Sequence, residues 1–227
     1  MTKPVYRTPE ERAKRSRAFW VSRPPAGYVL AGGASSRFGR DKALVELGGR
    51  TLLERTLALL KACGVREAAI VGAKSRYGRF GARCVKDKWP GEGPLGGIIT
   101  ALGTTVLNKY GYKCSLILSC DMPFMTADWL SYVFERGRLS DADVFVPKSE
   151  HRLEPLCACW NTSALAKLQD AFDQGVRKVT EAMKRLRVEV LDETHWKRFD
   201  SAGRLFWNMN TQQDYEEAVR VWEAGQA

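Results

Sequence analysis

Three glycines, two arginines and a lysine follow an apolar run in the segment Val29-Leu-Ala-Gly-Gly-Ala-Ser-Ser-Arg-Phe-Gly-Arg-Asp-Lys42. Gly32 and Gly33 have no Cβ, so the backbone can turn sharply there and bring its N–H groups close to an anion. Arg37 offers a planar fork and Lys42 a compact charge, which together suit different phosphates of one triphosphate. A glycine turn with solvated basic side chains is the alternative, but the direct succession from an apolar strand favours phosphate binding.

The spacing of these residues differs from that of a P-loop. Five residues separate Gly33 from Gly39, and Arg-Asp-Lys follows Gly39 where Gly-Lys-Ser/Thr is required. Residues 91–96 spell G-x-G-x-x-G, the pattern of a dinucleotide-binding turn, but Pro94 lies inside the pattern and the preceding strand ends several residues earlier. Pro94 is instead expected to be the first residue of a helix.

Polar residues after two other segments predict further parts of one site. Asp121 follows the buried apolar run at residues 115–119, and a carboxylate there suits Mg²⁺, which needs only one or two protein carboxylates. Capping of the turn before Pro123 is the alternative role. Asn208 and Asn210 lie two residues apart in an extended segment, so their amides point the same way and suit phosphate or metal-bound water. Asn210 could instead cap the last helix.

Histidine and cysteine chemistry is not indicated. His151 and His195 lie in polar stretches without a partner at metal-ligand spacing, which favours surface roles. The six cysteines are scattered and include no Cys-x-x-Cys pair. Cys157 and Cys159 are predicted to face the core from one side of a strand, and the pattern favours reduced thiols in a cytoplasmic protein.

Composition favours one domain and a polyanionic ligand. The chain has 227 residues, of which 44% are hydrophobic, and a formal net charge of +10. Residues 1–25 hold seven basic and two acidic residues, half of the surplus, and are predicted to form a flexible basic arm before a single domain at 26–227. Such an arm is more often disordered than a nucleic-acid readout surface. No stretch approaches 18 consecutive apolar residues, which argues against a membrane-spanning protein.

Apolar runs alternate with helical patterns, as in a layered α/β sheet. Strands are expected at residues 27–31, 68–71, 83–85, 115–119, 143–146, 154–160 and 188–191, and helices at 51–63, 95–107, 126–137, 162–174, 178–186 and from 211. The alternating pattern of 154–160 predicts a strand with one face toward solvent. Because ligands bind beyond the carboxyl ends of strands in such sheets, the polar segments described above are expected to converge.

Leu30–Lys42 resembles the signature loop of the molybdenum cofactor guanylyltransferases, LAGGxSxRMGxDK, with Phe38 where methionine is usual. Three further segments fit the family in the same order, namely Gly93-Pro-Leu-Gly-Gly-Ile98, Cys120-Asp-Met-Pro-Phe124, and Asn208-Met-Asn-Thr211 followed by Asp214. The resemblance implies a single-domain, three-layer α/β/α Rossmann-like nucleotidyltransferase (GT-A-like) fold with a mostly parallel, mixed sheet.

The resemblance also implies an activity, the Mg²⁺-dependent transfer of GMP from GTP to the phosphate of the molybdenum–molybdopterin cofactor. Its partners would be these two small molecules, with molybdenum cofactor donor and acceptor proteins. The implied catalytic residues are Arg37, Lys42 and Asp121, with Asp121 as the magnesium ligand. The implied nucleotide-binding residues are Leu30, Ala31, Gly32, Gly33, Lys42, Asp87, Gly93, Pro94, Leu95 and Asp121. Asn208 and Asn210 would contact the second substrate or the water on the metal.

Departures from the family pattern leave alternatives open. Gly72 stands where the family often has an asparagine that helps to read the base, so cytidylyl transfer to the same pterin, or nucleotidyl transfer to a sugar or cobinamide phosphate, stays possible. Asp87 could belong to an ordinary surface turn. Glu154 lies in a region that borders the pterin site in the family. A non-catalytic nucleotide- or RNA-binding protein is the alternative from another class.

Overall fold

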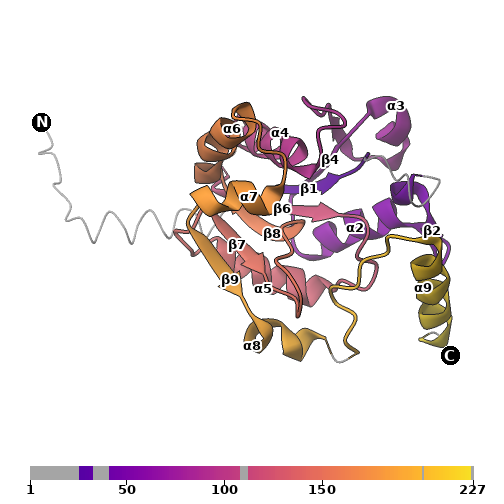
Figure 1. Ribbon diagram of the computed structural model, residues 1–227. Coiled ribbons are helices and arrows are strands. Elements are labelled where there is room, and N and C mark those ends of the chain that lie inside the picture. Colours follow the sequence, from indigo (N-terminus) through magenta and orange to yellow (C-terminus); the bar gives the residue numbers. More distant parts are fainter. Residues whose placement is uncertain (1–25, 33–40, 108–111, 201, 226–227) are drawn as a thin grey trace, which may run out of the picture.

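The structure, a computed structural model, describes residues 26–32, 41–107, 112–200 and 202–225. Its centre is a seven-stranded sheet (Figure 1). The strands, in spatial order, are β5 (Arg83–Val85), β4 (Glu67–Val71), β1 (Ala26–Leu30), β6 (Cys114–Ser119), β8 (Cys157–Asn161), β7 (Val144–Pro147) and β9 (Val188–Leu191). Only β8 runs antiparallel to its neighbours in this sheet. The predicted mostly parallel, mixed sheet is therefore confirmed.

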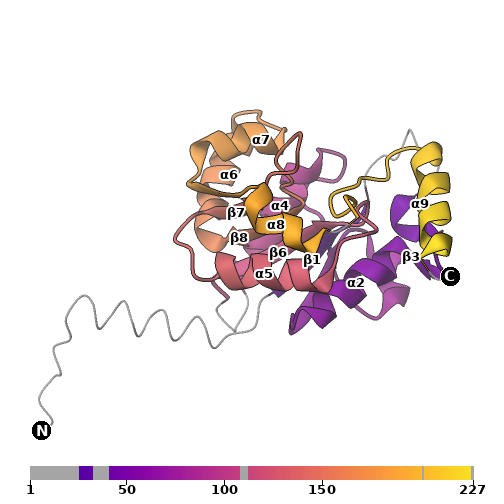
Figure 2. The same cartoon turned by 90° about the horizontal axis from the view of Figure 1, so that it is seen from below.

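Helices cover both faces of the sheet, which gives the predicted three layers (Figures 1 and 2). One face carries α2 (Leu52–Ala62) and α5 (Ala127–Gly137), and the other carries α4 (Pro94–Val106), α6 (Leu165–Asp173) and α7 (Val179–Ala182). Shorter elements are the β2–β3 hairpin (Glu46–Leu47 and Arg50–Thr51), α3 (Lys74–Tyr77) and α8 (Glu193–Trp196), with 3-10 turns at Lys42–Leu44, Gly78–Phe80, Thr162–Ala164, Met183–Arg185 and Lys197–Phe199. The last helix, α9 (Gln212–Ala224), packs beside the hairpin. None of the described helices is both long and apolar enough to cross a bilayer.

The predicted helix boundaries follow from local signals. Thr51 and Glu54 form a capping box at the start of α2, and Thr211 and Asp214 form another at the start of α9. Each box satisfies backbone N–H groups that a helix start leaves unpaired. Pro94 is the first residue of α4, as predicted, because its missing N–H has no partner there in any case.

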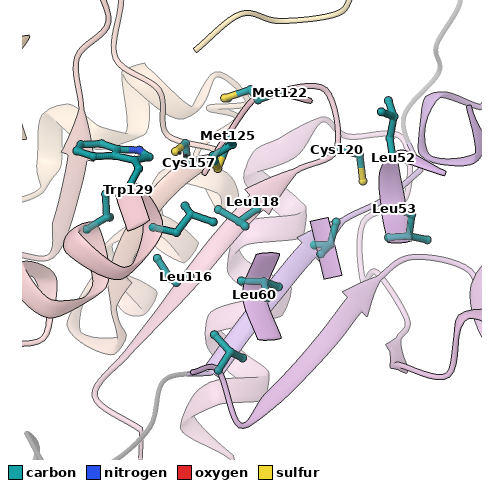
Figure 3. Close-up of a cluster of buried hydrophobic side chains, with 14 of the residues drawn as sticks. Leu52, Leu53, Leu60, Leu116, Leu118, Cys120, Met122, Met125, Trp129 and Cys157 are labelled. Carbon is teal, nitrogen blue, oxygen red and sulfur yellow. Dashed lines mark hydrogen bonds between the residues drawn. The ribbon is translucent and has the colours of Figure 1, made fainter. Parts of the chain in front are cut away.

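Strand β6 separates two hydrophobic clusters, because successive side chains of a strand point to opposite faces. Leu116 and Leu118 lie in the first cluster with α2 and α5, and Ile117 lies in the second cluster with α4 and α6. Figure 3 shows the first cluster, with Leu52, Leu53, Leu60, Leu116, Leu118, Cys120, Met122, Met125, Trp129 and Cys157 labelled. Cys157 and Cys159 are both buried in it, which confirms their predicted packing role.

The expectation of a half-solvated strand at 154–160 is wrong. The strand begins later, at Cys157, and every residue of β8 is buried. It lies between β6 and β7, with helices on both faces, so neither face meets solvent. The side chains of β8 alternate between the two core clusters, with Cys157 and Cys159 in the first and Ala158 and Trp160 in the second.

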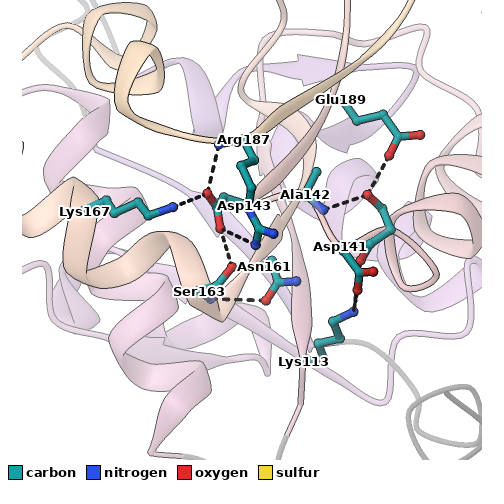
Figure 4. A network of polar contacts seen from close by, with 10 residues as sticks. Lys113, Asp141, Ala142, Asp143, Asn161, Ser163, Lys167, Arg187 and Glu189 are labelled. Atoms are coloured by element: carbon teal, nitrogen blue, oxygen red, sulfur yellow. Dashed lines mark hydrogen bonds and ion pairs between the residues drawn. The ribbon is translucent and has the colours of Figure 1, made fainter. Parts of the chain in front are cut away.

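A buried carboxylate fastens the start of β7 to its neighbours (Figure 4). The Asp143 side chain is fully buried and accepts hydrogen bonds from Lys167 Nζ at 2.6 Å, Ser163 Oγ at 2.6 Å and the Arg187 backbone N–H at 2.9 Å. Burial alone would raise the pKa of Asp143, but the hydrogen bonds from these three residues outweigh it and hold the pKa well below its usual range. The folded protein therefore stabilises the ionised form of the Asp143 carboxyl group.

Replacing Asp143 with alanine is expected to cost about 3 kcal/mol of unfolding free energy, because the donors around it lose a buried charged acceptor. Because the folded pKa is depressed, the stabilisation from Asp143 is fully present above the unfolded pKa, about 3.9, and is lost as the pH falls through the folded value. Thermal unfolding at pH 7 measures the first effect, and the fall in stability as the pH is lowered below the unfolded pKa measures the onset of the second. Asp141→Ala is the control, since its carboxylate is 94% exposed beside Lys113; equal stability of the two variants would contradict this role.

Candidate active site

Two cavities adjoin at the carboxyl ends of the parallel strands β1 and β6. The smaller has a volume of about 290 Å³ and the larger about 640 Å³. Pro94 and Leu156 line both cavities, so one molecule could extend from one into the other. This is the edge of the sheet where open α/β folds bind ligands.

The smaller cavity is lined by Leu30, Ala31, Gly32, Val71, Asp87, Gly91, Gly93, Pro94, Gly97 and Leu156. Gly32 and Gly93 have φ values of 102° and 85°, conformations that favour glycine. Gly93 is also the N-cap of α4 and gives it no side-chain cap, so the first N–H groups of this helix stay available to an anionic group at the cavity wall. Many residues predicted to bind nucleotide therefore share one cavity.

Asp87 both braces a turn and lines the smaller cavity. Its Oδ1 accepts hydrogen bonds from the Trp89 backbone N–H at 3.0 Å and from Thr100 Oγ1 at 3.3 Å. Within the described part of the chain, Oδ2 accepts none, so it remains available to a ligand hydroxyl or amine. The two interpretations of Asp87 are thus compatible, and its contact with the nucleoside stays a prediction.

Leu95 does not line the cavity. Its side chain is completely buried in the second core cluster, between α4 and the sheet. Residues at successive positions of a helix point about 100° apart, so Pro94 and Leu95 cannot both face the ligand. Of the predicted Gly93–Leu95 triplet, only the first two residues line the site.

Gly72 lies where β4 ends, and the structure explains why no larger residue stands there. A Cβ on Gly72 would lie 2.5 Å from the Ala31 carbonyl oxygen and 2.8 Å from the ring of Tyr77. Tyr77 itself is fully buried. An asparagine at this position would therefore clash with the Ala31 carbonyl oxygen and the Tyr77 ring unless one of them moved.

Gly72→Asn is expected to destabilise the fold by about 2 kcal/mol, as overpacking against a fixed backbone oxygen usually does. Thermal unfolding of the variant measures this loss. Gly103→Asn is the matched control, because nothing lies within 4 Å of the position that a Cβ on Gly103 would take. A Gly72→Asn protein as stable as the control would show that the Ala31–Tyr77 wall moves freely.

Asp121 lies at the wall of the larger cavity, just beyond β6. Ser119 Oγ donates a hydrogen bond to its Oδ1, which fixes the carboxylate. The Asp121 carbonyl oxygen accepts the Met209 N–H at 2.8 Å and so brings the distant segment 208–210 beside it. Asn208 and Asn210 both line the same cavity, as their two-residue spacing predicts.

Lys42 reaches this segment from a third part of the chain. It starts the 3-10 turn Lys42–Leu44, which Asp41 caps by accepting the Ala43 N–H at 3.1 Å. Lys42 Nζ donates to Asn210 Oδ1 at 2.8 Å. Segments around 42, 121 and 210 therefore meet at one place, as predicted, whereas Gly33 and Arg37 lie outside the described residues.

Basic residues that the sequence analysis did not single out also line the larger cavity, namely Arg152, Arg177 and Lys178. Arg177 pairs with Glu92 at 2.6 Å and stacks over the Phe172 ring at 3.9 Å. Only the adjacent Arg-Lys pair in a loop before a helix could have drawn attention to them. Arg152 pairs with Glu154 and Arg177 with Glu92, and Asp121 also lines the cavity, so its wall carries charges of both signs.

Glu154 lies in the wall of the larger cavity, where two protein groups donate hydrogen bonds to its carboxylate. It is buried and accepts hydrogen bonds from Ser149 Oγ and Arg152 Nε, both at 3.0 Å. Burial raises the pKa of Glu154 above its usual value, despite the opposing effect of Arg152. Both of these hydrogen bonds are accepted by the same oxygen, Oε1, so Glu154 is held against Arg152 within the cavity wall.

The histidines lie apart from both cavities. His151 is 88% exposed beside Glu150, and His195 Nδ1 lies 2.8 Å from Asp192 Oδ1 on α8. Neither residue lines the smaller or the larger cavity. Their predicted surface positions are confirmed.

Comparison with known proteins agrees with this arrangement. A family model described as the MobA-like NTP transferase domain matches residues 27–188. A protein of Pelotomaculum thermopropionicum, described as a probable molybdenum cofactor guanylyltransferase, is 32% identical over 193 residues, which cover 85% of this chain and 90% of that protein. A molybdenum cofactor guanylyltransferase of Desulfosudis oleivorans is 29% identical over 201 residues, covering 88% and 96%.

Solved structures show the same fold. The molybdopterin-guanine dinucleotide biosynthesis protein A of Archaeoglobus fulgidus superposes with a TM-score of 0.76 and 27% identity, covering 88% of this chain and 99% of that one. A 2-C-methyl-D-erythritol 4-phosphate cytidylyltransferase of Thermus thermophilus, 18% identical with a TM-score of 0.63, shares the architecture. The family match spans most of the sheet, all the residues that line the smaller cavity, and those that line the larger cavity except Asn208 and Asn210. The chain therefore belongs to the family of MobA-like NTP transferases and is a nucleotidyltransferase.

Proposed function

We propose that this enzyme transfers GMP from GTP to the terminal phosphate of the molybdenum–molybdopterin cofactor, releasing pyrophosphate. The observation that carries the proposal is the pair of adjoining cavities, of which the larger has Asp121 in its wall and Asn210, the partner of Lys42, in the same wall. A smaller, glycine-lined cavity suits a nucleoside, and a larger cavity with Arg152, Arg177 and Lys178 in its wall suits a phosphorylated acceptor. The names of the relatives supply the identity of both substrates.

The chemistry requires little acid or base from the protein. A phosphate monoester has a second pKa near 6, so the acceptor is already mostly ionised at neutral pH. One acceptor oxygen attacks the α-phosphorus of GTP, and the bond from that phosphorus to the β-phosphate bridge oxygen breaks, so that pyrophosphate leaves with the electron pair. The protein then has to align the two substrates and to neutralise the charge that develops.

From this chain, Lys42 and two basic residues in the wall of the larger cavity, Arg152 and Lys178, supply that neutralisation. Lys42 Nζ lies beside Asn210 at the edge of the larger cavity, and a phosphate could replace the Asn210 oxygen as its partner. Arg152 and Lys178 line the part of the cavity assigned to the acceptor. We assign Lys42 to the triphosphate and the two other cations to the acceptor phosphate.

A magnesium ion fits this site by its ligand chemistry. Asp121 offers carboxylate oxygens at the cavity wall, and Asn208 and Asn210 offer amide oxygens on the same wall, which are ligand types that Mg²⁺ prefers. Within the described residues no group of three or more His, Cys, Asp or Glu could hold a metal, so substrate phosphates and water would complete the shell. The bound ion would neutralise charge on the α-phosphate and the departing pyrophosphate.

The proposal is tested by turnover with purified substrates. The protein, GTP, Mg²⁺ and the molybdenum–molybdopterin cofactor are expected to yield the guanine dinucleotide and pyrophosphate in equal amounts, as chromatography and a pyrophosphate assay can measure. Replacing GTP by CTP should abolish most of the product. Product from CTP alone would identify a cytidylyltransferase, and pyrophosphate release without the pterin product would point to another acceptor.

The preference of the protein for one nucleotide base can also be measured in the absence of the pterin substrate. A nucleotide at 100 times its dissociation constant stabilises the folded protein by about 2.7 kcal/mol. GTP with Mg²⁺ is expected to raise the melting temperature more than CTP, ATP or UTP at the same concentration, with Mg²⁺ alone as the control. A larger shift with CTP would contradict guanine specificity and leave nucleotidyl transfer in place.

A further inference from the structure

Tyr77 is a buried polar residue that the chemistry described above does not use. It ends α3, its side chain is completely buried, and its hydroxyl donates a hydrogen bond to Asp41 Oδ2 at 2.8 Å. Burial, with the nearby Asp41 carboxylate, raises the pKa of Tyr77, so the phenol keeps its proton at neutral pH and remains a donor. A hydrogen bond from a buried phenol to a carboxylate is among the stronger kinds.

Asp41 uses its two oxygens for two different elements. Oδ2 is held by the Tyr77 hydroxyl and by Arg76 at 3.3 Å, while Oδ1 accepts the Ala43 N–H at 3.1 Å. The second bond caps the 3-10 turn that starts at Lys42. With both oxygens occupied, the Asp41 carboxylate cannot rotate without losing one of these bonds, so the turn is tied to α3.

The Tyr77 ring is itself fixed in place. It lies so close to Gly72 that a Cβ there would be 2.8 Å from the ring, and its hydroxyl is 3.5 Å from the position a Cβ on Gly32 would take. Gly72 follows β4 and Gly32 follows β1 closely, so the ring is wedged between the ends of two central strands. The hydroxyl therefore has little freedom to follow a shift of Asp41.

We propose that Tyr77 is a positioning residue for Lys42, acting through Asp41. A lysine side chain is long and flexible, so the place of its ammonium group depends on where its backbone begins. The hydrogen bonds from Tyr77 to Asp41 and from the Ala43 N–H to Asp41 fix the backbone at Lys42. From this position Lys42 Nζ reaches Asn210 Oδ1 at 2.8 Å. This inference rests on the proposed function, in which Lys42 binds the triphosphate.

The test is a double-mutant cycle with Tyr77→Phe and Lys42→Ala. Tyr77→Phe keeps the ring and removes the hydroxyl, and we expect kcat to fall about tenfold while KM for GTP changes less than threefold. In the Lys42→Ala background, Tyr77→Phe should cost nothing further, because its effect passes through Lys42. Tyr28→Phe is the matched control, since that buried hydroxyl pairs with Thr105 at 3.1 Å, and its kcat should not change.

The outcomes separate this inference from the proposed function. If Lys42→Ala keeps normal turnover, the role of Lys42 fails and the role of Tyr77 fails with it. If Lys42→Ala is impaired but Tyr77→Phe is normal, or lowers kcat by the same factor in both backgrounds, only the positioning role is overturned. Asp41→Ala enters the same cycle should Tyr77→Phe not fold, because alanine removes the acceptors of both the Tyr77 and the Ala43 hydrogen bonds; a fall in kcat of at least about tenfold is expected, and normal kcat would overturn the proposal.

Discussion

Lys42→Ala is expected to lower turnover by about two to three orders of magnitude, a loss of roughly 3–4 kcal/mol of transition-state stabilisation. Lys42 Nζ donates a hydrogen bond to Asn210. The neighbouring residue, Met209, donates its backbone N–H to the Asp121 carbonyl oxygen, so Lys42 and Asp121 contact the same segment. As the triphosphate breaks, negative charge grows on the departing pyrophosphate, where an ammonium group has its largest effect. Initial rates at saturating GTP and acceptor measure the change.

Lys197→Ala is the matched control for this prediction. Lys197 Nζ makes a hydrogen bond of the same length, 2.8 Å, but to Glu193, and its side chain is 74% exposed. Surface pairs of this kind contribute little to stability, so turnover and melting temperature should match those of the unsubstituted protein. Normal turnover in Lys42→Ala would remove Lys42 from the mechanism.

Asp121→Asn is expected to lose a comparable share of activity, about two orders of magnitude or more, if the carboxylate holds the metal. Asparagine keeps the size and one oxygen, so the bond from Ser119 and the backbone contact with Met209 can persist. What it loses is the charge that favours Mg²⁺. Raising the Mg²⁺ concentration should therefore recover part of the activity.

The dependence of the rate on Mg²⁺ concentration decides this point. A shift of the half-saturating Mg²⁺ concentration to higher values, with the melting temperature unchanged, is the expected signature. Asp128→Asn, an exposed carboxylate in the first turn of α5, should leave the Mg²⁺ curve where it is. An unchanged Mg²⁺ requirement in Asp121→Asn would argue against metal ligation by this residue.

Long, locally encoded elements could be predicted from the sequence. The capping box of α2, the apolar run of β6 and Pro94 at the start of α4 each carry their own signal, and the structure confirms all three. The β2–β3 hairpin and α3 were missed because elements of two to four residues are too short to show a period. The error at β8 has a different cause, since its place between β6 and β7 is decided by pairing with distant strands.

In the candidate site, too, residues in local motifs could be predicted, whereas contacts between distant residues could not. The motif around Lys42, Asp121 and the two asparagines could be predicted because each segment follows a strand or opens a helix, and such positions share one edge of the sheet. The place of Arg152 and Lys178 in the wall of the larger cavity was missed because neither residue belongs to a recognisable motif. The contact of Tyr77 with Asp41 joins residues 36 apart and could only come from the fold.

The most direct test of the account is a crystal structure of the protein with GTP and Mg²⁺ and without acceptor. We expect the guanosine in the cavity between Gly32 and Pro94, the triphosphate directed toward Lys42, and the metal on Asp121. A nucleotide bound elsewhere, or a triphosphate in this cavity with Lys42 and Asp121 both out of reach of it and its metal, would contradict the account.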